Sequence, residues 1–141
     1  MSLQPGELKE LYSHEDASKS LDKSAALFQP MVAEESGIAF VNLVDNQHPL
    51  SRVYILGYAC GGISIGDVDG DGWDDIYCTG GPRNSVLYKQ VGKLKFEDIT
   101  SESGVSAKGH WSVSSQFVDV DNDGDLDIYV CNYDTPNLLY I

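Results

Sequence analysis

Short runs of β-branched and aromatic residues alternate with polar segments along most of this chain. Ile63 to Ile65 and Ile76 to Cys78 flank one polar loop, and Phe117 to Val118 and Ile128 to Val130 flank a second. Gly, Asp and Asn bound these runs. Runs of this length and composition are typical of strands and not of helices. The pattern therefore predicts an all-β chain.

Two further runs follow the first polar loop. Residues 85–89 and 94–99 bracket Gln90-Val91-Gly92-Lys93, which predicts a hairpin with Gly92 at the turn. Together with the strands on either side of the polar loop, this hairpin gives about four short strands in one unit.

The chain repeats itself when it is shifted by 52 residues. Residues 61–89 then lie over residues 113–141 without a gap, and ten positions are identical. The identical pairs are Asp67/Asp119, Val68/Val120, Asp69/Asp121, Asp71/Asp123, Gly72/Gly124, Asp75/Asp127, Ile76/Ile128, Tyr77/Tyr129, Leu87/Leu139 and Tyr88/Tyr140. A period of about 50 residues with four strands is typical of a β-propeller blade.

A weaker echo flanks this unit. Glu35 to Ile38 resembles Glu102 to Val105, and both stretches follow a Phe and a β-branched residue. We therefore expect about two to two and a half four-stranded blades over residues 25–141. Residues 1–24 are expected to be a polar lead-in, for which a short helix and an irregular segment fit the sequence equally well.

The two polar loops are rich in aspartate. Residues 67–75 and 119–127 both fit the pattern D-x-D-x-D-G-x-x-D. Calcium takes about six to eight oxygen ligands, and carboxylates at alternate positions can converge on one ion if the chain curls, as the sixth-position glycine permits. Two calcium sites are predicted at hairpin turns, with a backbone carbonyl as the seventh-position ligand. Their ligands are Asp67, Asp69, Asp71, Trp73 and Asp75 in the first loop, and Asp119, Asp121, Asp123, Asp125 and Asp127 in the second.

An EF-hand begins with the same pattern but needs a bidentate Glu at the twelfth position and a helix on each side. The twelfth positions here are Cys78 and Val130, and the flanks are strand-like. The all-oxygen ligand set favours calcium over softer metals. Because protein oxygens fill the coordination sphere, the ion is expected to hold a hairpin turn together and not to perform chemistry.

The net charge of the chain limits which classes of partner it can bind. The chain has 22 acidic and 9 basic residues, a net charge of −13, and ten of the acids lie in the two loops. Such a charge argues against nucleic acid and anionic membrane surfaces as partners. No apolar run approaches the roughly 18 residues of a membrane span, so no membrane insertion is expected. The three cysteines and three histidines show no spacing typical of a zinc site.

A nucleophile pattern, G-x-S-x-G, occurs at Gly62 to Gly66. In hydrolases this motif joins a strand to a helix, whereas here it leads into an aspartate loop. Ser64 is replaced by Gln116 in the second unit, so the repeat does not require a hydroxyl. No catalytic residues and no enzymatic activity are expected.

These residues resemble the FG-GAP/VCBS repeats of integrin α-chain-like β-propellers. They are most similar to the repeats of secreted proteins with an ASPIC/UnbV domain, the cartilage acidic protein type. The resemblance covers roughly residues 27–141. The matching motifs are Gly61-Gly62, the stretch Ile63 to Asp75, Leu87-Tyr88, and Phe96 to Thr100 with Gly104.

The resemblance implies that each aspartate loop binds calcium at a blade's hairpin turn and that the protein is extracytoplasmic, its natural leader being absent from this sequence. It implies a propeller segment that serves binding, adhesion or scaffolding, with an unknown protein or glycan as partner. The alternative is the non-catalytic scaffold portion of a larger secreted enzyme. Because propellers close with about four to eight blades, we expect a fragment of a larger propeller, or a chain that associates with itself through open blade edges.

Overall fold

The computed structural model describes residues 27–42, 61–133 and 135–141. The chain divides into two compact units, Met1–Val32 and Ala33–Ile141. The described part of the first unit, residues 27–32, has no regular secondary structure. The lead-in predicted at residues 1–24 lies outside the described residues. None of the described helices is long and apolar enough to cross a membrane.

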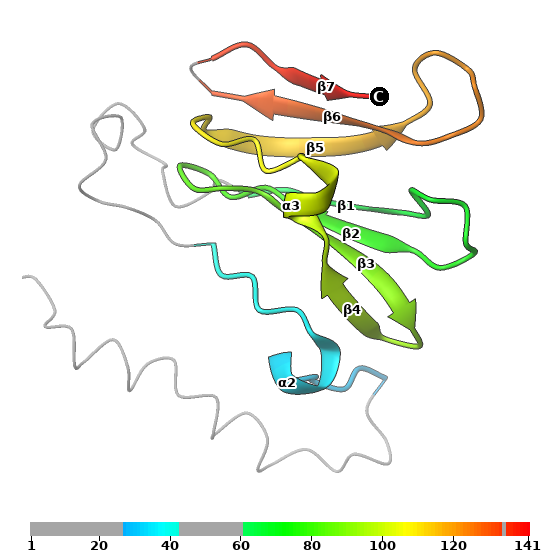
Figure 1. Cartoon of the computed structure of the whole chain (residues 1–141). Helices are drawn as coiled ribbons and strands as arrows, with labels where there is room; N and C mark the ends of the chain where they lie inside the picture. The colour runs from blue at the N-terminus through cyan, green and yellow to red at the C-terminus, as the bar shows by residue number, and fades with distance from the viewer. Residues whose placement is uncertain (1–26, 43–60, 134) are drawn as a thin grey trace, which may run out of the picture. The chain divides into compact units, whose positions relative to one another are not determined.

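The second unit contains the described helices and strands, and it is mostly β (Figure 1). Strands β1 to β4 form an antiparallel sheet in chain order, and β5 to β7 form a second antiparallel sheet. The prediction of an all-β chain is confirmed in that the described residues are mostly β, with two short helices, and the predicted number of blades stays a prediction. In chain order the elements are α2 (Ala33–Ser36), β1 (Ile63–Gly66), β2 (Asp75–Cys78), β3 (Val86–Gly92), β4 (Lys95–Asp98), α3 (Thr100–Ser103), β5 (Ser112–Val118), β6 (Asp127–Asn132) and β7 (Leu138–Tyr140).

The hairpin formed by β3 and β4 turns later than predicted. Lys93 and Leu94 form the turn, and Leu94 has a φ of 56°. Gly92 lies in β3, where it pairs with Lys95, and the register shifts between Gln90 and Gly92. Such a bulge places one extra residue in the strand and moves the turn along the chain. The prediction of Gly92 at the turn is therefore wrong.

The two one-turn helices, α2 and α3, are built alike. The N–H of Gly37 donates to the carbonyl of Ala33 at 2.7 Å, and the N–H of Gly104 donates to the carbonyl of Thr100 at 3.0 Å. Both glycines have positive φ, 85° and 71°, which is the usual way for a helix to end. The echo between residues 35–38 and 102–105 is thus a repeated structural element.

A side-chain network holds α3 against β3. The hydroxyl of Thr100 donates to Oδ1 of Asp98 at 2.6 Å, and its oxygen accepts the N–H of Leu87 at 2.9 Å. The N–H of Thr100 also donates to Asp98 at 3.0 Å. These bonds give a physical role to the Asp and Thr of the Phe96 to Thr100 motif.

The hydrophobic core of the unit takes residues from both sheets. Tyr77 and Leu87 come from the first sheet, Ile128 and Val130 from the second, and Val105 from the segment that joins the sheets. The hydroxyl of Tyr77 donates to the carbonyl of Val105 at 2.7 Å, so its buried oxygen has a partner. The partly buried residues that pack against this core are Ile99, Phe117, Leu138 and Tyr140.

Small residues bring β1 close to β5. The hydroxyl oxygens of Ser64 and Ser115 lie 2.7 Å apart, and Ser64 is buried. A Cβ at Gly62 would lie 2.8 Å from the Cα of Ser114, which is too close for a larger residue. Ile63 and Ile65, on the other face of β1, are exposed. Ser64 therefore has a packing role at the contact between the sheets.

Candidate metal sites in the two aspartate loops

Each aspartate loop connects two paired strands. The first loop joins β1 to β2 where Gly66 pairs with Asp75, and the second joins β5 to β6 where Val118 pairs with Asp127. The ninth-position aspartates thus begin the returning strands and are buried, whereas the loops between them face solvent. The loops occupy equivalent places in the two sheets, as the 52-residue repeat predicts.

The same three backbone-to-carboxylate hydrogen bonds recur in both loops. The first joins the sixth-position glycine N–H to the first aspartate: Gly72 to Asp67 at 2.8 Å, and Gly124 to Asp119 at 3.1 Å. The second joins the seventh-position N–H to the fifth-position aspartate, at 2.9 Å and 3.0 Å. The third joins the second-position N–H to the ninth-position aspartate, at 3.1 Å and 2.8 Å. The loops therefore share one fold, set by their own carboxylates.

Two residues in each loop have left-handed backbone angles. Gly72 and Gly124, in sixth position, have φ of 90° and 102°, which agrees with the curl predicted there. Gly70 and Asn122, in fourth position, have φ of 73° and 62°. Gly and Asn tolerate this region better than other residues, so the one difference at the fourth position keeps the backbone angle.

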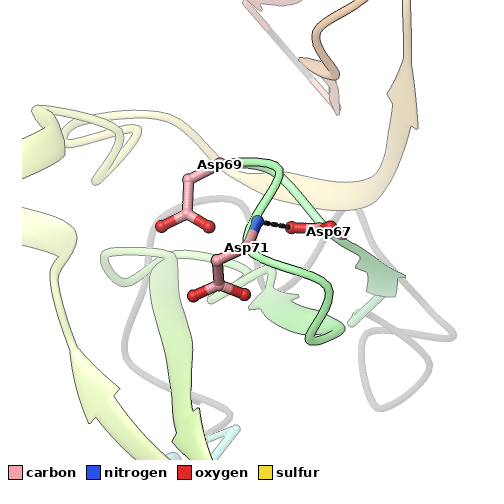
Figure 2. A group of neighbouring side chains, drawn as sticks. All are labelled: Asp67, Asp69 and Asp71. Atoms are coloured by element: carbon pink, nitrogen blue, oxygen red, sulfur yellow. Dashed lines mark hydrogen bonds between the residues drawn. The ribbon is translucent and has the colours of Figure 1, made fainter.

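Three carboxylates of the first loop converge. Asp67, Asp69 and Asp71 each offer one oxygen, and these oxygens lie within 4.8 Å of one another. Figure 2 shows Asp69 and Asp71 directed to the same side of the loop, while Asp67 accepts the N–H of Asp71, at 3.0 Å. This convergence agrees with the alternate-position pattern in the sequence.

A lysine reaches the first loop from β3. The ammonium of Lys89 pairs with Asp69, and it lies 3.1 Å from Oδ2 of Asp71. The backbone N–H of Trp73 and this ammonium hold the pKa of Asp71 below its ordinary value. The hydrogen bonds to Asp69 and Asp71 raise the pKa of Lys89. A positive charge of the chain thus already lies against the first cluster.

The second loop brings together a different trio, Asp119, Asp121 and Asp127, with oxygens again within 4.8 Å. Oδ1 of Asp119 is buried and accepts no hydrogen bond from the described residues. Loss of solvation, followed by the charge of Asp123, raises the pKa of Asp121. Within the described ranges, the ion pairs of Lys89 have no counterpart in this loop.

Asp75 lies apart from the first trio. Its two oxygens accept the N–H groups of Val68, at 3.1 Å, and of Gln90, at 2.8 Å. Burial raises the pKa of Asp75, since the charged form loses water. These bonds join the start of β2 to the loop at Val68 and to β3 at Gln90. A carboxylate oxygen has lone pairs for a second partner, so the role of Asp75 as a metal ligand stays a prediction.

The remaining predicted ligands lie outside the two trios. Asp123 accepts the N–H of Asp125 at 3.0 Å, and both residues are exposed. Trp73 is also exposed. The ligand roles of Asp123 and of the carbonyl groups of Trp73 and Asp125 stay predictions.

The residues present fit a hard divalent cation. Both trios contain carboxylates alone, which are ligands that calcium prefers. Like charges within 4.8 Å repel one another unless a cation lies between them. The buried oxygen of Asp119 without a hydrogen-bond donor is the kind of group that a cation would satisfy.

Lys89 lies against the first loop and is not part of the ligand pattern predicted from the sequence. A signal was present, because Lys89 follows the repeated Leu-Tyr pair in the first unit while Ile141 follows it in the second. At this position the two repeats carry residues of different charge, so the two aspartate loops can differ in the charge near them.

Residues 67–130 match the model of the FG-GAP-like repeat. The matched segment begins at the first aspartate of the first loop and extends past the second loop into β6. A comparison with curated proteins finds no match. Residues 67–130 are therefore similar to an FG-GAP-like repeat, which supports the FG-GAP family for this chain.

Proposed function

We propose that residues 25–141 are a calcium-binding β-propeller repeat segment in which each aspartate loop holds one ion. The observation that carries this proposal is the convergence of three carboxylates in each of two loops that share the same internal hydrogen bonds. One acidic turn is an ordinary surface feature. Two acidic turns at equivalent positions of a repeat, both within the segment that matches an FG-GAP-like repeat, support a shared function.

In this proposal the first ion is held by Asp67, Asp69 and Asp71, and the second by Asp119, Asp121 and Asp127. The other predicted positions complete each ligand set. Bound calcium supplies positive charge that offsets the repulsion among the carboxylates. Since each loop joins two strands of one sheet, calcium stabilises a hairpin.

The segment serves binding, adhesion or scaffolding in an extracytoplasmic protein, with a protein or glycan as partner. The family match supports an extracytoplasmic place, because FG-GAP repeats commonly occur in extracellular proteins. Trp73 supports a contact role for the first loop, because a large apolar side chain on an exposed loop is a feature of interaction surfaces.

Thermal unfolding of the chain, measured in calcium and in EDTA, tests the proposal. A ligand that binds only the folded state stabilises it by about 2.7 kcal/mol at a free concentration 100 times its Kd, so calcium should raise the Tm. An Asp71→Asn/Asp123→Asn double variant should lose most of this response.

Asp74→Asn is the matched control, because Asp74 is an exposed carboxylate of the first loop outside the ligand pattern. It changes the charge of the first loop as Asp71→Asn does and should keep the calcium response. An identical Tm of the parent chain in calcium and in EDTA would rule out the calcium sites.

A further inference from the structure

The cation already present at the first loop comes from the neighbouring strand of the same sheet. Lys89 lies in β3, and its ammonium pairs with Asp69 and Asp71, two of the three carboxylates in the first trio. The ammonium therefore lies against the group of oxygens that the proposed calcium ion would use.

The backbone beside Lys89 is fixed to the same loop. Gln90 donates its N–H to Oδ1 of Asp75 at 2.8 Å, and Tyr88 pairs with Ile76 in the sheet. Lys89 lies between these two anchored residues. Its side chain therefore starts from a defined position one strand away from the loop, and its long stem bridges the remaining distance.

The second loop has an apolar residue at the matching place. Tyr140 pairs with Ile128 in the second sheet as Tyr88 pairs with Ile76 in the first, so Ile141 occupies the position of Lys89. Isoleucine carries no charge. Among the described residues, the two sites thus share one loop fold and differ by the positive charge of Lys89.

We infer that Lys89 is a built-in counter-cation that competes with calcium for the first loop, so that the first loop is the weaker site and the second loop the tighter one. The inference rests on the proposed calcium function of the same loops. Calcium fills the second loop first. It enters the first loop at a higher concentration, because the ammonium of Lys89 must leave Asp69 and Asp71.

Lys89 also affects the calcium-free state of the first loop. Lys89 offsets part of the carboxylate repulsion in the first loop, whereas no basic side chain among the described residues pairs with the second loop. The first hairpin is therefore less dependent on calcium than the second. This asymmetry gives the segment one structural ion and one exchangeable ion.

Calcium titration by calorimetry tests the inference on Lys89→Met, which removes the charge and keeps most of the stem. The titration uses a background that carries Asp121→Asn, so that the first loop is read alone. Two exposed ion pairs are lost, and calcium should bind the first loop roughly three- to tenfold more tightly. Lys93→Met in the same background is the control, because Lys93 is exposed in the turn after β3 and has no ion pair with either loop.

The reciprocal variant, Ile141→Lys, is measured in a background that carries Asp69→Asn, so that the second loop is read alone. It should weaken calcium binding to the second loop by a similar factor. Equal affinities for Lys89→Met and Lys93→Met would overturn the inference while leaving the calcium sites in place. Absence of calcium binding by the parent chain and by every variant would overturn the proposed function, and this inference with it.

Discussion

Tyr77 and Tyr129 occupy equivalent positions in the two repeats, yet Tyr77 is 0% exposed and Tyr129 is 38% exposed. Leu87 and Leu139 differ in the same way, at 3% and 45%. Tyr77 and Leu87 lie in the core between the two sheets. Their equivalents in the second sheet lie on the side of that sheet that faces away from the core, whereas Phe117 and Ile128 lie on the core side. The same repeat unit therefore has a core residue or a surface residue at one position, depending on what covers the sheet.

The largest expected effect tests this difference in burial directly. Tyr77→Ala should lower the free energy of unfolding by about 3 to 5 kcal/mol, because it leaves a cavity in the core and removes the hydrogen bond to Val105. Tyr129→Ala should cost less than about 1 kcal/mol, since its side chain is partly solvated. Chemical denaturation of both variants measures the contrast, and equal losses would contradict the burial difference.

The stability of the chain at alkaline pH gives a second test of the difference in burial between Tyr77 and Tyr129. Burial raises the pKa of Tyr77 to about 12, whereas a tyrosine in an unfolded chain has a pKa of about 10. The unfolded chain loses its proton first, so the stability from this group is complete below about pH 10 and is lost as the pH rises toward 12. The loss attributable to Tyr77 should be about 2 kcal/mol.

Tyr77→Phe removes this titration, so its unfolding free energy should fall less between pH 9 and pH 12, roughly, than that of the parent chain. Tyr129→Phe is the control, because it makes the same substitution at the equivalent, exposed position of the second repeat. Denaturant unfolding at several pH values gives the measurement. Parallel pH profiles for the parent and Tyr77→Phe would contradict the burial of the phenol.

The smallest expected effects lie in the loops, where the two repeats are most alike. Gly72→Ala and Gly124→Ala should each cost about 1 kcal/mol, because both positions have positive φ and alanine is strained there. Gly70→Asn, which gives the first loop the fourth-position residue of the second, should change stability by less than about 0.5 kcal/mol. Thermal unfolding in EDTA separates these values, and a large cost for Gly70→Asn would show that the loops are not interchangeable.

The repeat was the most informative feature of the sequence. The 52-residue register correctly paired the two loops, the strands next to them and the Leu-Tyr segments, because each of these depends on local residues and on hydrogen bonds within one unit. The echo at residues 35–38 and 102–105 likewise marked two helix ends that each need a glycine with positive φ.

Features that depend on neighbouring elements could not be read from the sequence. A run such as Ile63 to Ile65 predicts a strand but not that Ser64 is its buried side, because the close approach of β5 decides which face is covered. The bulge before Gly92 moved a turn. Lys89 acts across one strand, a distance that no pattern within the loop expresses.

The contact between the two sheets joins two non-equivalent sides of the repeat. The side of the first sheet that carries Tyr77 meets the side of the second sheet that carries Phe117, and these are unlike surfaces of one repeat. Tyr129 lies on the second sheet's copy of the surface that carries Tyr77. An assembly that reuses this contact joins unlike surfaces, so its symmetry is that of a ring or an open row and not that of a two-fold dimer.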